Sequence, residues 1–349
     1  MRSDVSDPIA VPETRRPALE RVLAALDAAG RIVLTTHVNA DGDGAGSEAA
    51  LGAWLAARGK SVTIVNPTPF PATYLHLVAD PVQVADLGTA QAERALHAAE
   101  LFAVLDTSEP KRLGRLPRLI DDRPAVVIDH HPPGETRVSG TAVQDPTASA
   151  TGELVFDLLR LADPGGAWPA VVAEALYTAL VTDTGSFRFA NTTPRTHAVA
   201  AELLLRGVDP EAVYRRLFAT VPLRRIELLR AALERLEADP DAHVSWISLP
   251  RSILEPLNAT SEDLDGIVEY ARSIKGTEVA ILFRELPDAS TKVSWRSNGE
   301  VDVNALARKF GGGGHVKAAG ALIGQPLDAA RRAVLDATRM AVQALERGS

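Results

Sequence analysis

The sequence predicts an α/β protein: an N-terminal domain with a doubly wound parallel sheet, a helical connector, and a smaller α/β C-terminal domain. Three observations lead to this fold class. Short apolar runs such as 31–36 and 101–105 alternate with stretches of helical spacing and short loops, which is typical of a parallel sheet covered by helices. From 194 to about 237 only helical patterns occur. Beyond Asp239-Pro240-Asp241, strands and helices alternate again over roughly 100 residues, enough for a second domain.

The individual elements follow from apolar spacing and from turn residues. Helices are expected where apolar residues recur every three or four positions, and strands where a short apolar run is bounded by turn signals. Gly30 and Gly59 end the first two helices. The expected strands are 31–36, 61–65, 101–105, 125–128, 243–247, 277–283 and 291–295. The expected helices are 17–29, 48–58, 70–79, 90–99, 151–161, 169–182, 223–236, 264–274, 304–310 and 328–347.

Composition excludes several classes of protein. An apolar content of 46% and a charged content of 23% are those of a soluble globular protein, and no run of about 18 apolar residues indicates a membrane span. Residues 1–17 are charged, contain proline and lack the apolar core of a secretory signal, so we interpret them as a mobile lead-in. Cysteine is absent, which excludes disulfides and thiolate metal sites, and we expect a cytoplasmic protein. The net charge of -8 argues against electrostatic binding of long nucleic acid over a broad surface.

Acidic and imidazole side chains stand where the expected strands end. In an open α/β sheet the carboxyl ends of the strands form the ligand crevice, so we expect these groups to converge there. Crowded carboxylates repel one another unless a cation neutralises them, and two divalent ions sharing a carboxylate catalyse attack of water on phosphorus. Taken singly, each group has an ordinary alternative as a turn or cap residue. The candidates are His37, Asp41 and Asp43; Asp106; Asp129, His130 and His131; and Asp183.

A run of four glycines, 311–314, lies between two structured segments. Successive backbone N–H groups in such a run form a concavity suited to phosphate oxygens, to which His315 and Arg296 add side-chain donors. The alternative is a flexible hinge, as most glycine runs are. Arg188, between two phenylalanines after Asp183, is a further phosphate-binding candidate or else a solvated edge residue.

The motifs together resemble those of the DHH phosphoesterase superfamily, which includes RecJ-like exonucleases and manganese-dependent family II pyrophosphatases. The resemblance spans residues 31–190 and rests on His37-x-Asn39-x-Asp41-x-Asp43, Asp106, Asp129-His130-His131 and Asp183. It implies two Mn²⁺ ions, with Mg²⁺ or Co²⁺ as alternatives. His37, Asp41 and Asp106 would hold one ion. The other would be held by Asp43, Asp106, His130 and Asp183, with Asp106 bridging.

The same resemblance assigns the remaining roles in this domain. His131 would act on the substrate phosphate as an acid or hydrogen-bond donor, Asp129 would orient its neighbours, and Asn39 belongs to the first motif. The family usually has proline where Ala40 stands, which changes the stiffness of the loop and no ligand.

The segment Gly311–His315 resembles the GGGGH motif of the DHH-associated C-terminal domain. With it the resemblance covers nearly the whole chain and indicates the oligoribonuclease and pAp-phosphatase (nanoRNase) subfamily. The implied substrates are very short oligoribonucleotides, pAp, and linear or cyclic dinucleotides such as pApA and cyclic di-AMP, and the implied assembly is a homodimer. The implied substrate-binding residues are Arg296, Gly312, Gly313, His315 and Asn304, with Arg188 added from the first domain.

The leading hypothesis is therefore a two-metal phosphohydrolase that releases 5′-mononucleotides from short oligoribonucleotides and dephosphorylates pAp to AMP. One alternative is a manganese-dependent inorganic pyrophosphatase, against which the glycine-rich loop argues. The other is a non-catalytic nucleotide-binding module, against which the complete ligand set argues. The expected division is a lead-in (1–17), a catalytic domain (18–195), a helical connector (196–240) and a substrate-binding domain (241–349).

Overall fold

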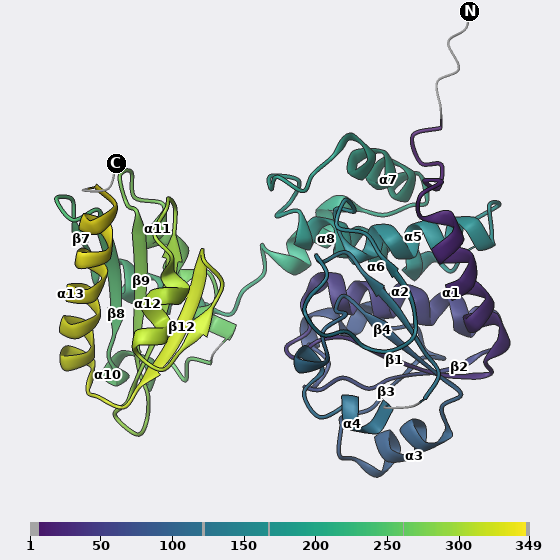
Figure 1. The fold of residues 1–349 in the computed structure, drawn as a ribbon, viewed down its shortest axis with the longest axis horizontal. Helices are drawn as coiled ribbons and strands as arrows, with labels where there is room; N and C mark the ends of the chain where they lie inside the picture. Colours follow the sequence, from purple (N-terminus) through teal and green to yellow (C-terminus); the bar gives the residue numbers. More distant parts are fainter. Residues whose placement is uncertain (1–6, 121–122, 167, 261, 347–349) are drawn as a thin grey trace, which may run out of the picture. The chain divides into compact units, whose positions relative to one another are not determined.

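The computed structural model describes residues 7–120, 123–166, 168–260 and 262–346. The chain forms two compact units, Met1–Ala219 and Thr220–Ser349, each with its own sheet (Figure 1).

The first unit is built on a six-stranded parallel sheet with the strand order β3-β2-β1-β4-β5-β6. β1 pairs in parallel with both β2 and β4, so that Ile32 lies opposite Val62 and Leu101. This is the doubly wound order, in which the order of successive strands reverses between β1 and β4 and ligands bind at the carboxyl ends of the strands. The predicted fold class is therefore confirmed. The strands are β1 (Arg31–Thr35), β2 (Ser61–Ile64), β3 (Gln83–Val84), β4 (Leu101–Leu105), β5 (Ala125–Asp129) and β6 (Thr141–Gln144).

Helices cover both faces of this sheet (Figure 1). α1, α2, α5 and α6 share one apolar core with alternate strand residues such as Leu34 and Ile128, while α3, η2 and α4 pack on the opposite residues such as Val33 and Phe102. The alternation follows from the two-residue period of a strand. The helices of this unit are α1 (Arg16–Ala28), α2 (Gly42–Ala57), η1 (Ala72–Leu77), α3 (Ala90–Ala98), η2 (Pro110–Leu113), α4 (Pro117–Ile120), α5 (Thr151–Ala162), α6 (Ala170–Asp183), α7 (Pro194–Leu205) and α8 (Pro210–Leu217).

The helix after β1 begins earlier than predicted. The glycines of 42–46 indicated a loop, but α2 begins at Gly42 and its first turns already belong to the helix. These glycines let α2 approach α6 closely: a Cβ on Gly42 would lie 2.4 Å from Thr182 Cγ2, and one on Gly46 would lie 2.6 Å from the Ala175 carbonyl oxygen. The expected helix 70–79 is likewise corrected to a shorter 3₁₀ helix, η1.

The second unit has a six-stranded mixed sheet with the order β11-β12-β10-β9-β8-β7, in which only β8 and β9 are parallel. α12 and α13 pack on one face around Trp295, and α9 and α11 pack on the other around Leu282. Its strands are β7 (Leu236–Asp239), β8 (Val244–Leu249), β9 (Val279–Glu285), β10 (Thr291–Ser297), β11 (Gly313–Gly314) and β12 (Ala318–Ile323). Its helices are α9 (Leu223–Leu233), α10 (Arg251–Leu254), η3 (Glu262–Leu264), α11 (Ile267–Arg272), α12 (Val303–Lys309) and α13 (Leu327–Glu346).

Two segments differ from the expected division of the chain. Of the expected lead-in, residues 1–6 lie outside the described residues, whereas Val11 and Arg15 are buried against the first unit. The expected connector is shared, because α7 and α8 belong to the first unit and α9 to the second. Within the described parts of the chain, no helix is both long and apolar enough to cross a membrane.

Candidate metal centre

The first group of candidate ligands lies around the start of α2. His37 follows β1, and Asp41 caps α2 by accepting hydrogen bonds from the backbone N–H groups of Asp43 and Gly44 at 3.1 Å each. Asp106 follows β4, the strand adjacent to β1, and its φ of 59° places it in the left-handed region. His37 Nε2 lies 3.2 Å from Asp106 Oδ2 and 3.6 Å from Asp41 Oδ2. One ligand atom from each of the three side chains therefore reaches a common point.

A second group forms on the other side of Asp106. His130 Nε2 lies 3.7 Å from Asp43 Oδ2, 3.7 Å from Asp106 Oδ1 and 3.6 Å from Asp183 Oδ2. Asp43, His130 and Asp183 again offer ligand atoms close enough to share one cation. The two carboxylate oxygens of Asp106 thus face different histidines, which is the arrangement of a bridging ligand.

The histidines of both groups are oriented as metal ligands are. His37 Nδ1 lies 2.9 Å from the Val38 carbonyl oxygen, and His130 Nδ1 lies 3.3 Å from the Ala148 carbonyl oxygen. A proton on each Nδ1 leaves the Nε2 lone pair free. Both Nε2 atoms are buried, have no hydrogen-bond partner among the described residues and face carboxylates. A cation between nitrogen and oxygen satisfies all of these atoms, so the residues present fit divalent metal ions.

Electrostatics support the same conclusion. Burial and the neighbouring carboxylates of Asp106 and Asp183 raise the pKa of Asp43 well above its usual value. Burial, with repulsion from Asp106, also raises the pKa of Asp183 to about 6. Burial opposes the charged form of His37, but the nearby carboxylates of Asp106 and Asp41 raise its pKa to about 10. Without a cation, protons must compensate the crowded negative charge.

Beside these groups lies a histidine with a different environment. The hydrogen bond of His131 Nδ1 with Asp129 Oδ1, 2.8 Å long, raises the pKa of His131. Asp129 is buried and also accepts hydrogen bonds from the His131 backbone N–H and from Gln144 Nε2. The Nδ1 contact leaves His131 Nε2 available to a substrate.

The structure adds residues that sequence reasoning missed. The backbone N–H groups of Thr151 and Gly152, in the first turn of α5, donate to the two oxygens of Asp43 at 2.6 and 2.9 Å. Thr151 Oγ1 donates to Asp106 Oδ1 at 2.9 Å. Asn191 Nδ2 donates to Asp183 Oδ2 at 3.1 Å. The signal for the first two was the start of a helix, where free N–H groups bind anions.

Two predicted residues of this unit lie apart from the ligand groups. Asn39 is exposed and has a φ of 55°, and its backbone N–H donates a hydrogen bond to Thr68 Oγ1. Arg188 is exposed and donates through Nε to the Gly185 carbonyl oxygen. Across the described residues, no hydrogen bond or ion pair joins either side chain to the six candidate ligands.

The predicted substrate-binding residues of the second unit gather near β11 and the adjoining strands. The predicted loop 310–320 is corrected in part, because Gly313–Gly314 and Ala318–Ile323 form strands that pair with each other. Gly312 and Gly314 are required by this close approach, because a Cβ on Gly312 would lie 2.1 Å from the Gly320 carbonyl oxygen and one on Gly314 would lie 2.5 Å from the Ala318 carbonyl oxygen. His315 is exposed, while its backbone is hydrogen-bonded to Ala318.

Two further side chains of that unit present polar atoms. Asn304 Oδ1 is buried with no hydrogen-bond partner among the described residues, and it lies 3.8 Å from the place of a Cβ on Gly313. Arg296 is held by the Trp295 carbonyl oxygen at 2.9 Å and by Glu269 at 3.3 Å.

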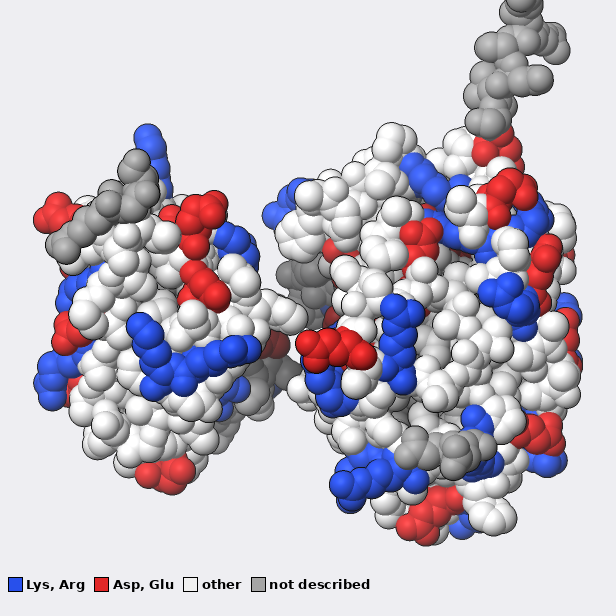
Figure 2. Space-filling view, in the orientation of Figure 1, with Lys and Arg blue, Asp and Glu red and all other residues white. Residues whose placement is uncertain are grey.

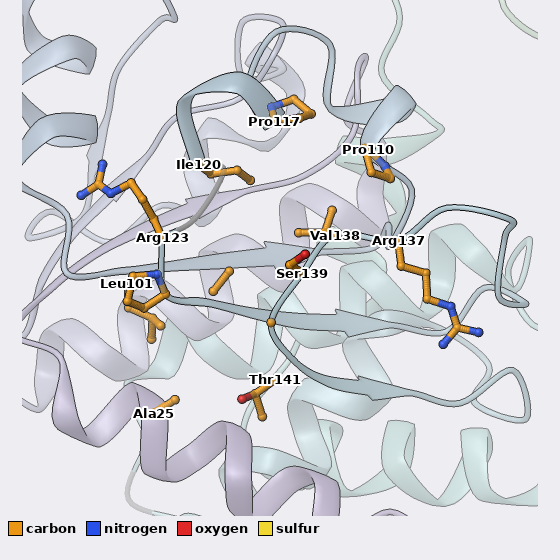
Figure 3. A pocket seen from close by; sticks show the side chains of 13 residues that line it. Ala25, Leu101, Pro110, Pro117, Ile120, Arg123, Arg137, Val138, Ser139 and Thr141 are labelled. Carbon is orange, nitrogen blue, oxygen red and sulfur yellow. The ribbon is translucent and has the colours of Figure 1, made fainter.

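A surface cavity of about 430 Å³ lies elsewhere in the first unit (Figure 3). It is bounded by Leu101, Ala125 and Thr141, the first residues of β4, β5 and β6. The cavity therefore lies at the amino ends of these strands, whereas the candidate ligands lie at the carboxyl ends. Its Arg123 donates to the carbonyl oxygens of Leu96 and Ala99. This cavity is therefore separate from the metal centre.

Comparison with known proteins identifies the family. Residues 31–180 match the DHH family, N-terminal domain, and residues 243–344 match the DHHA1 domain. The chain is 36% identical over 311 residues to the bifunctional oligoribonuclease and PAP phosphatase NrnA of Thermus thermophilus, covering 89% of this chain and 90% of that protein. It is 29% identical to the Bacillus subtilis protein of the same name, and the match covers 84% of this chain and 89% of that protein. The crystal structure of an exopolyphosphatase-related protein from Bacteroides fragilis superposes with a TM-score of 0.86 at 26% identity, and the match covers 95% of this chain and 98% of that one.

The agreement of fold, domain order and sequence over nearly the full length confirms the resemblance. The chain belongs to the DHH family of phosphoesterases that carry a DHHA1 domain, the family of the NrnA-type enzymes.

Proposed function

We propose that this chain is a two-metal phosphohydrolase that releases 5′-mononucleotides from very short oligoribonucleotides and dephosphorylates pAp to AMP. The observation that carries the proposal is the pair of ligand groups that share Asp106, with two buried histidine nitrogens facing carboxylates. The names of the Thermus and Bacillus relatives support this choice of substrates.

The proposed ligands divide into two sets. One cation would be held by His37, Asp41 and Asp106, and the other by Asp43, Asp106, His130 and Asp183. The mixture of imidazole nitrogen with carboxylate oxygen suits Mn²⁺, which we propose as the ion, with Mg²⁺ or Co²⁺ as substitutes. When bound, the two ions supply activation of water for attack on phosphorus and neutralise charge on the phosphoryl oxygens.

The protein's own residues then act on the leaving group. The contact with Asp129 holds the His131 ring and favours its protonated form, so Nε2 carries a proton. As the bond between phosphorus and the leaving oxygen breaks, that oxygen takes the proton from His131 Nε2, which avoids release of an alkoxide. Gln144 donates to Asp129 and to the His131 carbonyl oxygen, and thereby fixes the pair.

We propose that the second unit binds the nucleotide. Arg296, Asn304 and His315 offer side-chain polar atoms. Gly312 and Gly313 are proposed as part of the same site because the exposed Gly313 has no Cβ to hinder the approach of a phosphate, whereas the Gly312 N–H donates to the Ala307 carbonyl oxygen. On the face shown in Figure 2, acidic and basic side chains are interspersed over both units. This pattern, with the net charge of -8, fits a small anionic substrate rather than long duplex nucleic acid.

The test is hydrolysis of a 5′-labelled diribonucleotide and of pAp by the purified protein, with Mn²⁺ and after chelation. Metal-dependent release of mononucleotide and of phosphate from pAp is the expected result. Parallel assays with pApA and cyclic di-AMP rank the dinucleotides. Hydrolysis of pyrophosphate alone would support the pyrophosphatase alternative, and nucleotide binding without turnover would support a non-catalytic module. Sedimentation velocity tests the expected homodimer.

A further inference from the structure

A short segment between β6 and α5 contacts one side of the metal centre. This anchor segment, Ala148–Gly152, makes five contacts with candidate ligands or with a residue that holds one. The Ala148 carbonyl oxygen faces His130 Nδ1 at 3.3 Å, and the Ser149 carbonyl oxygen accepts from Asn191, which itself donates to Asp183. The remaining contacts are those of Thr151 with Asp43 and Asp106, and of Gly152 with Asp43.

These contacts divide unequally between the two proposed metal positions. Asp43, His130 and Asp183 all depend on the anchor segment directly or through Asn191. Among the described residues, no hydrogen bond joins His37 or Asp41 to this segment, since His37 is held by Val38 and Asp41 by the start of α2. Displacement of the segment would therefore disturb one position and leave most of the other intact.

A buried carboxylate fixes the anchor segment. Glu153 Oε2 accepts hydrogen bonds from Ser149 N at 3.0 Å and from Ser149 Oγ at 2.8 Å. Its other oxygen, Oε1, accepts from Arg15 Nη1 at 2.7 Å. Glu153 is only 1% exposed, so its position depends on these partners and on Arg195, whose Nε lies 3.3 Å away.

Arg15 joins three acidic residues at this point. Its Nη1 also donates to Asp157 at 2.8 Å, and its Nε donates to Asp145 at 2.6 Å. The side chain is 4% exposed. A planar guanidinium presents several donors in fixed directions, so it can hold these carboxylates in one arrangement as an ammonium group cannot. Without it, Glu153 and Asp157 would be left buried beside each other with Arg195 as their remaining cation.

We propose that Arg15 is a positioning residue for the metal position formed by Asp43, His130 and Asp183, acting through Glu153 and the anchor segment. This inference rests on the proposed two-metal centre. It gives the segment before α1 a role in metal binding, although Arg15 touches no candidate ligand.

The test compares Arg15→Met with Arg16→Met in the full-length protein. Arg16 is adjacent in sequence, but its side chain is 37% exposed, and Glu13 is its one ion-pair partner among the described residues. Mn²⁺ binding is measured by equilibrium dialysis and by electron paramagnetic resonance, in which two coupled ions differ from a single ion. We expect Arg15→Met to weaken binding of the second ion by about 10-fold, the lower end of the effect of losing a group that bonds a metal ligand directly, because Arg15 acts through Glu153 and the anchor segment. The first ion should bind normally, and Arg16→Met should behave as wild type.

Hydrogen exchange of the metal-free protein gives a readout independent of turnover. We expect faster exchange of the Thr151 and Gly152 amides in Arg15→Met, with unchanged exchange in the second unit. If that variant fails to fold, Arg15→Lys keeps the positive charge without the fork of donors and should show the same selective weakening. Equal affinity for both ions in wild type and variant, or equal weakening of both, would overturn the role of Arg15. A wild-type protein that binds no pair of ions would instead overturn the proposed function.

Discussion

Replacing Asp106 with asparagine separates metal binding from folding. Asparagine has the shape of aspartate and accepts the left-handed backbone conformation at this position better than most residues. Its carbonyl oxygen can keep the hydrogen bond from Thr151. The substitution also removes the carboxylate that contributes most to raising the pKa of His37, so a neutral imidazole can accept through Nε2 from the new amide, where the carboxylate oxygen now lies at 3.2 Å. The substitution therefore removes one negative charge from the cluster without leaving a buried group unpaired.

The expected magnitude follows from linkage. A cation present at 100 times its dissociation constant stabilises the protein that binds it by about 2.7 kcal/mol. For a unit of about 200 residues, each kcal/mol shifts the midpoint of thermal unfolding by roughly 2–4 °C, so Mn²⁺ should raise that midpoint by about 5–11 °C. In Asp106→Asn this increase should disappear, while the midpoint in chelator should equal or exceed that of wild type because carboxylate repulsion is relieved.

The assay is thermal unfolding of wild type, Asp106→Asn and a surface control, Asp27→Asn, each with chelator and with saturating Mn²⁺. Asp27 lies on α1, and within the described part of the chain its carboxylate pairs with the exposed Arg58, so its variant should retain the full shift. Turnover of Asp106→Asn should fall by about a thousandfold or more, which corresponds to the several kcal/mol that metal ions supply to the transition state. A retained Mn²⁺ shift in Asp106→Asn would refute the bridging assignment. A large loss of stability in chelator would refute the argument that asparagine fits.

Three other outcomes are expected. Burial raises the pKa of Glu48 to about 8, so the free energy of unfolding should fall as the pH rises from about 4.5 to 8. Urea titrations with chelator should show a smaller fall in Glu48→Gln, and an equal pH dependence in both proteins would contradict this prediction. In Gly152→Ala a new Cβ would lie 2.5 Å from Ala179 Cβ, so the start of α5 should shift and dialysis should show weaker Mn²⁺ binding. Gly165→Ala, at an exposed position, should bind Mn²⁺ normally. Normal binding by both variants would reject the role of the start of α5 in holding Asp43. His315→Ala should weaken pAp binding in calorimetry and leave the Mn²⁺ content unchanged, and a loss of metal instead would argue against its placement in nucleotide binding.

Four strands of the first unit, β1, β2, β4 and β5, could be predicted because their apolar runs are short and continuous. Burial on both faces requires such runs in a parallel sheet, and Leu101–Leu105 is buried at every position. β3 and β6 were missed because they are short, lie at the two edges of the sheet and carry few buried apolar residues. The start of α2 could not be predicted in this way, because Gly42, Gly44 and Gly46 have low helical propensity and their value lies in contact with distant residues. β12 was missed for a related reason, since Ala318–Ile323 contains alanine and glycine where bulkier residues usually mark a strand.

The candidate ligands could be predicted from their residue types and from their places at strand ends. The groups that hold them could not, because they depend on pairs brought together only by folding. Thr151 meets Asp43 across more than 100 positions of sequence, and the alanine, serine and glycine around it carry no obvious signal. Arg15 was assigned to a mobile lead-in by the charge and proline content of its surroundings, which cannot reveal that Glu153 and Asp157 lie within reach.

The apolar cores of the two units share no residue among the described parts of the chain, and every candidate metal ligand belongs to the first unit. Divalent cations should accordingly slow amide hydrogen exchange around these ligands. Amides in the core of the second unit then provide an internal reference within the same molecule, so that protection by the ion can be measured without a separate reference protein. A protein stripped of its ions would also keep much of its helical signal in circular dichroism. Spectroscopic evidence of folding is thus a poor guide to whether a preparation is competent for hydrolysis.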